Sequence, residues 1–226
     1  MKRWLFAALC LLLAAGFAAL GVWQVERRAW KRDLLARVEG RIHAVPRALP
    51  RIWSDDLAYT PVRTRGVFLH DRETPVQAVT ELGPGYWVMT PLRTGDRIVL
   101  VNRGFVPQER RDPATRRPGQ VAGTVTVTGL MRASEPGGGF LRGNDAGADR
   151  WYSRDVAAIA RARSLAGAAP FFIDADRAAN PGGFPVGGLT VIAFRNNHLI
   201  YAVTWFALAA LALGGAVLLL RGRAEP

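Results

Sequence analysis

Residues 4–23, WLFAALCLLLAAGFAALGVW, form a run of twenty residues without a charge. As an α-helix rising about 1.5 Å per residue, this run would span about 30 Å, the thickness of the hydrocarbon core of a bilayer. Trp4 and Trp23 stand at its two ends, where amphipathic rings favour the headgroup boundary. Residues 199–220, LIYAVTWFALAALALGGAVLLL, form a second uncharged run, of twenty-two residues. The two runs predict transmembrane helices that frame the chain.

The first run has an alternative interpretation as a cleaved signal peptide, because Ala18, Ala19 and Gly21 resemble a small-residue processing site. The apolar region of a signal peptide is normally about 7 to 15 residues long. The run here is longer, and its helical pattern continues beyond the membrane without a break. The sequence therefore favours an anchor.

Residues 24–46 have the pattern of an amphipathic stalk helix. Apolar residues recur at helical spacing on one face, namely Trp23, Trp30, Leu34, Val38 and Ile42. Charged residues lie mostly on the other faces, namely Glu26, Arg27, Arg28, Lys31, Arg32 and Arg37. We expect the apolar stripe to pack on the domain that follows, with partner binding as the alternative. Pro46 and Pro50 end the helical structure.

Residues 47–198 have the pattern of one domain rich in strands. Runs of branched and aromatic residues occur at 59–69, 75–81, 86–92, 97–105, 124–130, 171–174 and 189–194. Residues 83–85 predict a turn, and residues 94–96 predict a short hairpin connection. The expected fold class is an α+β membrane protein, in which two transmembrane helices flank one strand-rich domain outside the membrane, an antiparallel sheet or small barrel.

Three other segments of this domain have distinct patterns. A helix is expected at 154–163, with Ser153 as its N-cap and Asp155 in its first turn. Residues 107–120 combine four arginines with prolines and have no periodicity, which predicts an exposed loop. The glycine-rich residues 136–147 predict another loop.

The chain is basic, with Lys+Arg 30 against Asp+Glu 18 and a formal net charge of +12. The arginines are spread from Arg3 to Arg223, whereas a nucleic-acid-binding protein gathers them on one element beside aromatic platforms. We therefore expect no nucleic acid and a use of the charge toward anionic membrane lipid. The only cysteine, Cys10, excludes an internal disulfide and zinc sites that need two or more thiolates.

Two spans place both termini on one side of the membrane and the central domain on the other. Basic residues near membrane ends tend to be cytoplasmic. Lys2, Arg3, Arg221 and Arg223 favour cytoplasmic termini, but the basic residues at 27, 28, 31, 32 and 195 favour the opposite orientation. Charge alone leaves the orientation open.

Motifs for catalysis are missing from the sequence. No serine lies in a G-x-S-x-G elbow, and no glycine run has the spacing of a dinucleotide or phosphate loop. The carboxylate pairs Asp55 with Asp56 and Asp174 with Asp176 are interpreted as solvated rather than catalytic. We expect no catalytic residues and a protein that is not an enzyme.

The three histidines are His43, His70 and His198, and no two have the close helical spacing of a metal site. His198 follows Asn196 and Asn197, which are good caps for the second span. On that helix His198, Tyr201 and Trp205 line one face. His198 is then either an axial ligand for a haem iron or an interfacial histidine that bonds to water and headgroups. The residues alone leave both open.

Short motifs along nearly the whole chain resemble one family. They are 21–24 (GVWQ) with Arg27 and Lys31; Tyr59, Pro61, Val62, Gly66 and Phe68; 85–92; 101–107 (VNRGFVP); Gly129, Leu130, Arg132, Ser134 and Glu135; Trp151, Arg154 and Asp155; 172–174; and 197–206. In this order the chain resembles the Surfeit locus protein 1 family, cytochrome c oxidase biogenesis factors of bacterial and mitochondrial inner membranes that include the yeast Shy proteins. The family usually has Trp where this chain has Phe105.

The resemblance implies a two-pass protein of the bacterial inner membrane. Residues 1–3 and 221–226 would be cytoplasmic, 4–23 and 199–220 would span the membrane, and 47–198 would be periplasmic beyond the stalk at 24–46. It also implies a role in maturing haem–copper cytochrome c oxidase, through haem a delivery to the catalytic subunit. The catalytic subunit, membrane lipid and haem a synthase are the implied partners, and a non-haem scaffold is the alternative.

The resemblance also suggests where haem a would bind, because some bacterial members bind it through the histidine that matches His198. If the two spans pack together, both membrane-exit motifs meet. The hypothesis is that His198 ligates the iron, Arg27 pairs with a propionate, and aromatic rings cover the porphyrin. The expected site is His198, Tyr201, Trp205, Trp23, Gln24 and Arg27.

Overall fold

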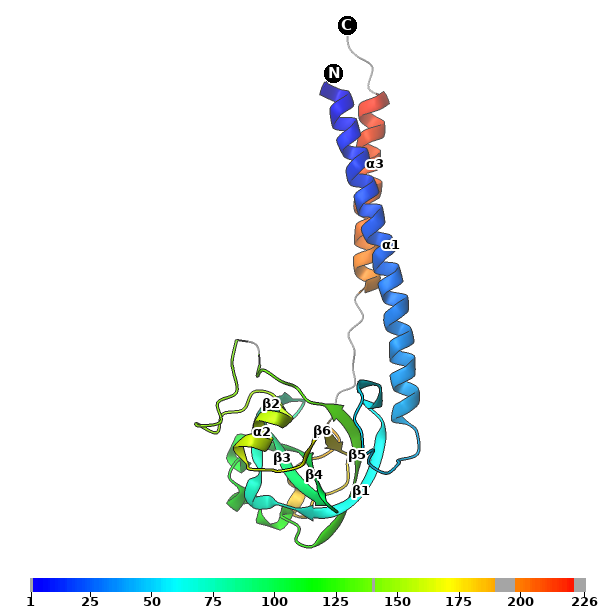
Figure 1. Cartoon of the computed structure of the whole chain (residues 1–226). Helices are drawn as coiled ribbons and strands as arrows, with labels where there is room; N and C mark the ends of the chain where they lie inside the picture. The colour runs from blue at the N-terminus through cyan, green and yellow to red at the C-terminus, as the bar shows by residue number, and fades with distance from the viewer. Residues whose placement is uncertain (1, 140, 190–197, 222–226) are drawn as a thin grey trace. The chain divides into compact units, whose positions relative to one another are not determined.

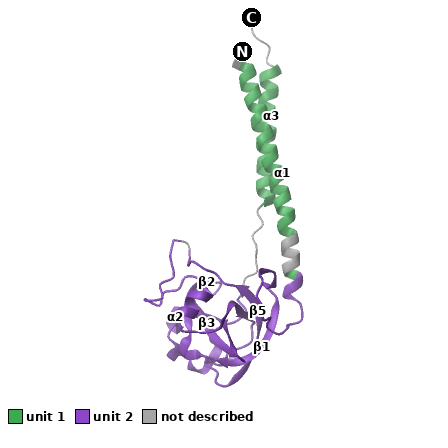
Figure 2. Cartoon of the chain, viewed as in Figure 1, with its two compact units in different colours: residues 1–39, 192–226 green, residues 40–191 purple. Residues whose placement is uncertain are grey.

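The computed structural model describes residues 2–139, 141–189 and 198–221 (Figure 1). The chain forms two compact units, one of Met1–Glu39 with Ile192–Pro226 and one of Gly40–Val191 (Figure 2). Of the predicted segments, residues 190–194 of the last strand and the caps Asn196 and Asn197 lie outside the described residues.

The first unit contains two long apolar helices, as the uncharged runs predict. Helix α1 covers Lys2–Ile42 and helix α3 covers His198–Arg221. Their apolar segments are Arg3–Arg32 and His198–Arg221, and an 18-residue stretch of each has a mean hydropathy of 2.5 and 2.3, with only 11% and 6% of that stretch buried in the protein. A core helix of a soluble protein would be mostly buried, so these helices are suited to lipid.

Helix α1 runs without interruption from the predicted span through the predicted stalk. It ends at Ile42, a few residues before the predicted end of the stalk at Pro46. The structure describes only part of the apolar stripe predicted for the stalk helix, because the side chains of Leu34 and Val38 lie outside the described part of the chain. Of the stripe positions in the first unit, Trp23 and Trp30 are 53% and 49% exposed.

Helices α1 and α3 pack against each other in an antiparallel arrangement. A Cβ added at Gly215 would lie 3.8 Å from the Cys10 Sγ, and one added at Gly21 would lie 2.7 Å from the Phe206 ring. The Phe17 and Trp205 rings stack with centroids 5.7 Å apart. As residue numbers rise on α1 they fall on α3, so the two membrane-exit motifs meet at the same end of the pair. Gly21 takes part in this contact.

The second unit is a small barrel. Within the described residues its strands are β1 (Pro61–Phe68), β2 (Thr74–Thr80), β3 (Gly83–Thr94), β4 (Arg97–Pro107), β5 (Thr124–Ala133) and β6 (Ala168–Ala175). The sheet order is β1-β5-β6-β4-β3-β2, and an additional pairing of β1 with β3 closes five of the strands into a ring (Figure 1). Strand β2 extends the sheet from β3. The α+β fold class and the small barrel are confirmed.

The strand pairings of the two hairpins show where the chain turns, and they confirm one of the two predicted turns. The predicted connection at 94–96 is confirmed, since β3 and β4 pair from Thr94 with Arg97 onward. The predicted turn at 83–85 is wrong, because Thr80 pairs with Gly83 and the turn is residues 81–82. The segment 83–85 belongs to β3, where a Cβ on Gly85 would clash with the β4 backbone at Val106. Close strand approach, rather than turning, requires that glycine.

Both faces of β4 and β6 are buried, because these two strands pair in parallel at the centre of the sheet. Alternate residues such as Val99, Val101 and Phe171 contribute to one core inside the barrel, to which all five barrel strands contribute. Leu100 and Phe172 face a second core that contains Trp151 and helix α2 (Val156–Ala162). Strands buried on both faces have continuous apolar runs, as these do.

Two further local predictions for this unit are wrong. The N-cap of α2 is Asp155, whose carboxylate accepts from the Ala158 N–H, rather than Ser153. The Ser153 hydroxyl instead accepts from the Gly138 N–H in the neighbouring loop.

The segment 107–120 is not a plain exposed loop. It forms the 3₁₀ turns η3 (Gln108–Arg110) and η4 (Pro113–Gly119), and Arg116 in η4 is buried. The remaining 3₁₀ turns are η1 (Asp55–Leu57), η2 (His70–Arg72) and η5 (Pro181–Gly183).

The helix pair predicts a cross-link that uses the native cysteine. In Gly215→Cys the new thiol would lie beside Cys10, so mild oxidation should form an intrachain disulfide. Gly214→Cys is the matched control, because a Cβ at Gly214 meets nothing within 4 Å. The products are resolved by non-reducing electrophoresis of membranes. Equal cross-linking of both variants would contradict the antiparallel register.

Gly104 is expected to be the least replaceable glycine of the barrel. It has φ +127°, and an added Cβ would lie 2.1 Å from the Val186 carbonyl oxygen. Gly104→Ala should therefore lower the free energy of unfolding by about 2–4 kcal/mol. Gly123→Ala, at φ +79° with open space, should cost only about 1 kcal/mol. Tryptophan fluorescence during thermal unfolding compares the two, and similar losses would refute the close approach.

Candidate functional site

The two membrane-exit motifs meet through a hydrogen bond between Gln24 on α1 and His198 on α3. The His198 Nδ1 lies 2.7 Å from the Gln24 Oε1, although the residues are 174 positions apart. Gln24 is buried, with 9% exposure, and His198 is half-buried at the first residue of α3. The predicted meeting of the two motifs is confirmed for this pair.

The hydrogen bond determines which imidazole nitrogen carries the proton. An amide oxygen only accepts hydrogen bonds, so Nδ1 is the donor to Gln24. In the neutral imidazole the Nε2 lone pair is then available for a metal or another donor. Histidine ligands in proteins are usually oriented in this way, by a second residue that holds the other ring nitrogen.

The aromatic residues of the expected site are divided between two environments. Trp205 is half-buried and stacks on Phe17 of α1, so its ring takes part in the contact between the helices. Tyr201 and Trp23 are exposed on the helix pair, at 54% and 53%. These two rings are therefore accessible to a flat apolar molecule or to lipid.

Arg27 lies one turn beyond Gln24 on α1 and is exposed. Its guanidinium lies over the Trp30 ring, 4.1 Å from the ring centroid, in a cation–π contact. Arginine stacked in this way still presents donors at the edge of its plane. It can therefore receive a carboxylate or phosphate without leaving the aromatic ring.

These residues fit a haem in their chemistry. A haem iron needs one or two axial ligands from the protein, and a neutral imidazole nitrogen is a common one. His198 offers Nε2, Arg27 offers a cation for a carboxylate, and Tyr201 and Trp23 offer apolar rings. Across residues 2–139, 141–189 and 198–221, no three His, Cys, Asp or Glu side chains form a metal cluster.

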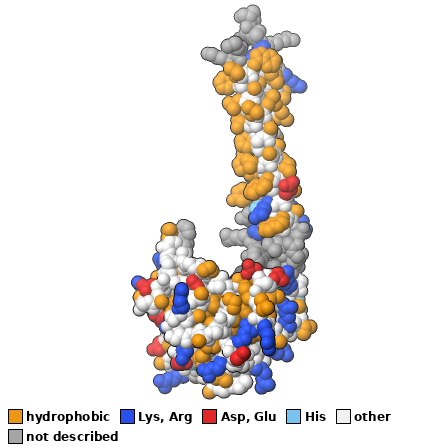
Figure 3. Space-filling model, viewed as in Figure 1, with side chains coloured by type: hydrophobic (Ala, Val, Ile, Leu, Met, Phe, Trp, Pro, Cys, Tyr) orange, Lys and Arg blue, Asp and Glu red, His pale blue; other side chains and the backbone are white. Residues whose placement is uncertain are grey.

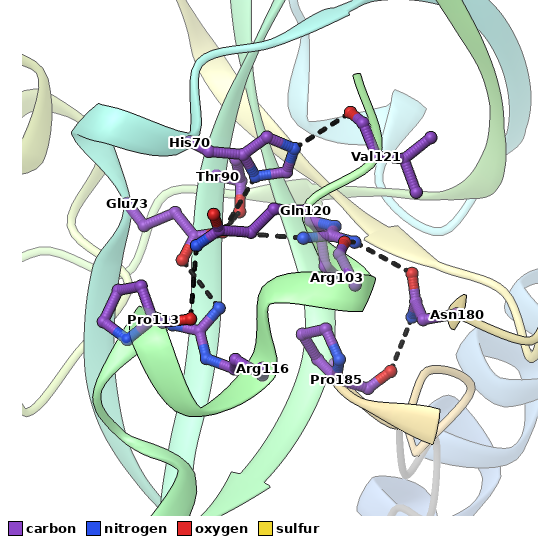
Figure 4. A network of polar contacts seen from close by, with 12 residues as sticks. His70, Glu73, Thr90, Arg103, Pro113, Arg116, Gln120, Val121, Asn180 and Pro185 are labelled. Atoms are coloured by element: carbon purple, nitrogen blue, oxygen red, sulfur yellow. Dashed lines mark hydrogen bonds and ion pairs between the residues drawn. The ribbon is translucent and has the colours of Figure 1, made fainter. Parts of the chain in front are cut away.

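Sequence reasoning missed a buried ionic cluster in the barrel unit, shown in Figure 4. The Glu73 carboxylate, 2% exposed, accepts from the Arg116 Nη1 at 2.7 Å and the Arg103 Nη1 at 3.5 Å. The Thr90 hydroxyl and the His70 Nδ1 also contact its Oε1, at 3.1 and 3.2 Å. Arg103 further donates to the Gly119 carbonyl and the Asn180 Oδ1. The Glu73 carboxylate, directly before β2, therefore binds both Arg103 of β4 and Arg116 of η4.

The ionisation of this cluster follows from its neighbours. Burial raises the pKa of Glu73, but the hydrogen bond from His70 and the charges of Arg116 and Arg103 outweigh it, so the pKa lies below its ordinary value. Burial lowers the pKa of Arg103, and Glu73 opposes this effect only in part. The carboxylate is therefore ionised at neutral pH, as two buried guanidinium groups require.

A second cluster shows that Asp174 is not the solvated carboxylate that the sequence suggests. Asp174 is 2% exposed and accepts from the Asn102 Nδ2 at 2.8 Å, the Arg132 Nη1 at 2.6 Å and the Arg154 Nη1 at 3.0 Å. Arg154 also binds Glu135. Asp176 lies beyond β6 and accepts from the Ala178 N–H, while Asp55 and Asp56 are exposed as expected. The partners of Asp174 come from β4, β5 and the segment just before α2.

The motif residues account for the second cluster and for Arg103 of the first, but not for Glu73 or Arg116. Asn102 and Arg103 of the 101–107 motif bind Asp174 and Glu73, and the Asn102 Oδ1 also accepts from the Gly104 N–H at 3.1 Å. Arg132, Glu135 and Arg154 of the later motifs complete the second cluster. The motifs carried the signal for these positions, but no spacing in the sequence could pair them.

Comparison with known proteins decides the family. The model of the SURF1 family matches residues 11–210 of the chain. This chain belongs to the SURF1 family. Surfeit locus protein 1 of Homo sapiens is 39% identical over 220 residues, covering 88% of this chain and 72% of the relative. The Mus musculus protein is 38% identical over 219 residues, covering 88% and 71%. The SURF1-like protein of Drosophila melanogaster is 36% identical over 225 residues, covering 88% and 72%.

Membership of the SURF1 family confirms the resemblance drawn from the motifs. The matched residues 11–210 include both sides of the Gln24–His198 pair and all members of the two buried clusters. The family match therefore covers the barrel unit and most of the apolar helix pair.

The Glu73 cluster predicts a strong and pH-dependent effect on stability. Glu73→Gln leaves two buried guanidinium groups unbalanced and should cost about 3–5 kcal/mol at pH 7. Because the folded pKa of Glu73 is lowered, its stabilisation is complete above its ordinary unfolded value, about 4.3, and is lost as pH falls through the lower folded value. Thermal unfolding should show the difference between wild type and variant shrinking below about pH 4.

Glu81→Gln is the matched control, because Glu81 is an exposed glutamate of the same unit. The free energy of unfolding of this variant should lie within about 0.5 kcal/mol of the wild-type value, both at pH 7 and below about pH 4. If Glu73→Gln were as stable as Glu81→Gln at pH 7, the cluster would not stabilise the barrel.

Proposed function

We propose that this protein is an assembly factor for haem–copper cytochrome c oxidase that receives or presents haem a at the Gln24–His198 pair. The observation that supports the haem role is the hydrogen bond that places the His198 proton on Nδ1 and leaves Nε2 available. Membership of the SURF1 family supports the assembly role.

Each residue of the site has a part in this proposal. His198 holds the iron through Nε2, and Gln24 fixes the orientation of the ring. Arg27, supported on Trp30, pairs with a propionate, while Tyr201 and Trp23 lie along the porphyrin face. Trp205 keeps the two helices together through Phe17. The haem contributes the redox-active iron that the oxidase requires, and the protein contributes binding and orientation.

The proposed setting is the bacterial inner membrane. Helices α1 and α3 are long and apolar enough for two passes. In this proposal both termini are cytoplasmic and the barrel unit is periplasmic. The catalytic subunit of the oxidase is the proposed partner, with haem a synthase as the donor and membrane lipid around the helices. No step of the proposed role makes or breaks a covalent bond, so the protein is proposed not to be an enzyme.

His198→Ala should remove the bound haem. Wild type and variant are purified from cells that make haem a, and their visible spectra are compared at equal protein concentration. The variant should carry at least about ten-fold less haem a, because the single proposed axial ligand is lost. His43→Ala, a histidine of the second unit, should keep the wild-type spectrum.

Wild-type protein that is free of haem, from membranes with confirmed haem a, would contradict the haem role. If His198→Ala also supported full oxidase maturation, the protein would be a scaffold for an oxidase intermediate and His198 an interfacial residue. Loss of haem from both His198→Ala and His43→Ala would likewise refute a site-specific ligand.

A further inference from the structure

The barrel unit has a basic groove that the haem site does not use. Its walls are the first half of β1, the hairpin between β3 and β4, and residues 48–51 before the barrel. It has a volume of about 580 Å³ and is lined by Leu49, Arg51, Arg63, Arg65, Asp96 and Arg97, with Thr64 and Thr94 at its base. Figure 3 shows how widely basic side chains are spread over the barrel unit.

The groove exists because the barrel closes over only part of β1. Strand β1 pairs with β3 only at Val67 and Phe68. Before Val67 that side of β1 faces residues 47–51 instead, and Arg47 bridges to Val62. The ring of strands is therefore open along Arg63 and Arg65, on the side turned toward the β3–β4 hairpin.

The walls of the groove are fixed. The Arg97 Nη1 donates to the Pro50 carbonyl at 2.8 Å, which ties the hairpin to residues 48–51. Leu49 packs against the barrel core. The Thr64 and Thr94 hydroxyls are hydrogen-bonded at 3.1 Å across the base. The groove is thus a formed concavity within the range of about 300–1,000 Å³ of ligand sites.

The charge of the groove is not balanced within the described chain. Four arginines line it against one carboxylate, that of Asp96. Elsewhere in the unit arginines such as Arg116 and Arg132 meet carboxylates at 2.7 and 2.6 Å. Arg51, Arg63 and Arg65 are exposed, and the described residues give them no ion pair. Guanidinium groups gathered in a concavity attract carboxylates or phosphates.

The register of β1 indicates the shape of the ligand. Arg63 and Arg65 alternate with buried residues, so both side chains lie on the outer face of the strand. Residues two apart on a strand are separated by about 6.6 Å, which is also the spacing of alternate side chains in an extended peptide. A single phosphate would engage one guanidinium, whereas alternating carboxylates would engage two in register.

We propose that this basic groove docks an extended acidic segment of a partner protein, with carboxylates at alternate positions. Arg63 and Arg65 bind successive carboxylates, and Arg51 holds the segment from the opposite wall. The binding is electrostatic, so it weakens with salt. This docking site is separate from the Gln24–His198 pair and does not rest on the proposed haem role.

The test uses the full chain in nanodiscs of neutral phosphatidylcholine. The probe is a fluorescein-labelled peptide, Thr-Glu-Thr-Glu-Thr-Glu-Thr, and binding is followed by fluorescence anisotropy. The double variant Arg63→Glu/Arg65→Glu should weaken binding at least about ten-fold, because attraction becomes repulsion. A peptide of the same composition with its three glutamates adjacent should bind about three-fold or more weakly, since only the alternating peptide matches the strand spacing.

The matched control is Arg117→Glu/Arg161→Glu, which makes the same charge change at two exposed arginines outside the groove. This control should bind the peptide within about two-fold of wild type, and thermal unfolding verifies that both double variants are folded. Absence of peptide binding to wild type, or equal loss in both double variants, would overturn the proposal. Capture of phosphatidylglycerol vesicles that requires Arg63 and Arg65, without peptide binding, would assign the groove to lipid phosphate instead.

Discussion

The parallel pairing of β4 with β6 is the constraint on which the barrel unit depends. It places an apolar strand between two cores, so Val101 faces the barrel interior while Leu100 faces Trp151 and α2. The pairing ends at Asn102 with Asp174. Directly after that point, Arg103 of β4 enters the Glu73 cluster. Both buried ionic clusters therefore lie next to the central pair of strands, which they connect to β5, η4 and the residues just before β2 and α2.

Those clusters decide how the loops of the unit are held. Segment 107–120 has little apolar surface, yet Arg116 anchors it to Glu73 and Arg103 anchors its end through Gly119. Similarly, Arg154 holds the start of α2 against β6 through Asp174. Buried charges of this kind stabilise less than apolar packing would, but removing one partner is expensive. The loops thus acquire defined positions from charge rather than from hydrophobic burial.

Much of the fold could be predicted from local pattern, because spans, strands and the β3–β4 hairpin leave a periodic or punctuated signal. Pairings between distant segments could not, since Glu73 and Arg116 are 43 positions apart and Asp174 and Asn102 are 72 apart. Asp174 therefore looked solvated, and Arg116 looked like one more arginine of an exposed loop. In the helix pair the sequence singled out His198 and Gln24 by motif, but only the antiparallel packing made them partners.

The identity of the His198 partner sets the strength of any bond that its Nε2 makes. A carboxylate facing Nδ1–H draws the proton toward itself and makes imidazole a more basic, more tightly held ligand. Gln24 is a neutral amide, so its oxygen orients the ring without placing a negative charge beside it. Any bond that Nε2 makes therefore lacks the added strength that a carboxylate partner would give it. In the proposed haem role, that suits a group that is held for a short time and then passed on.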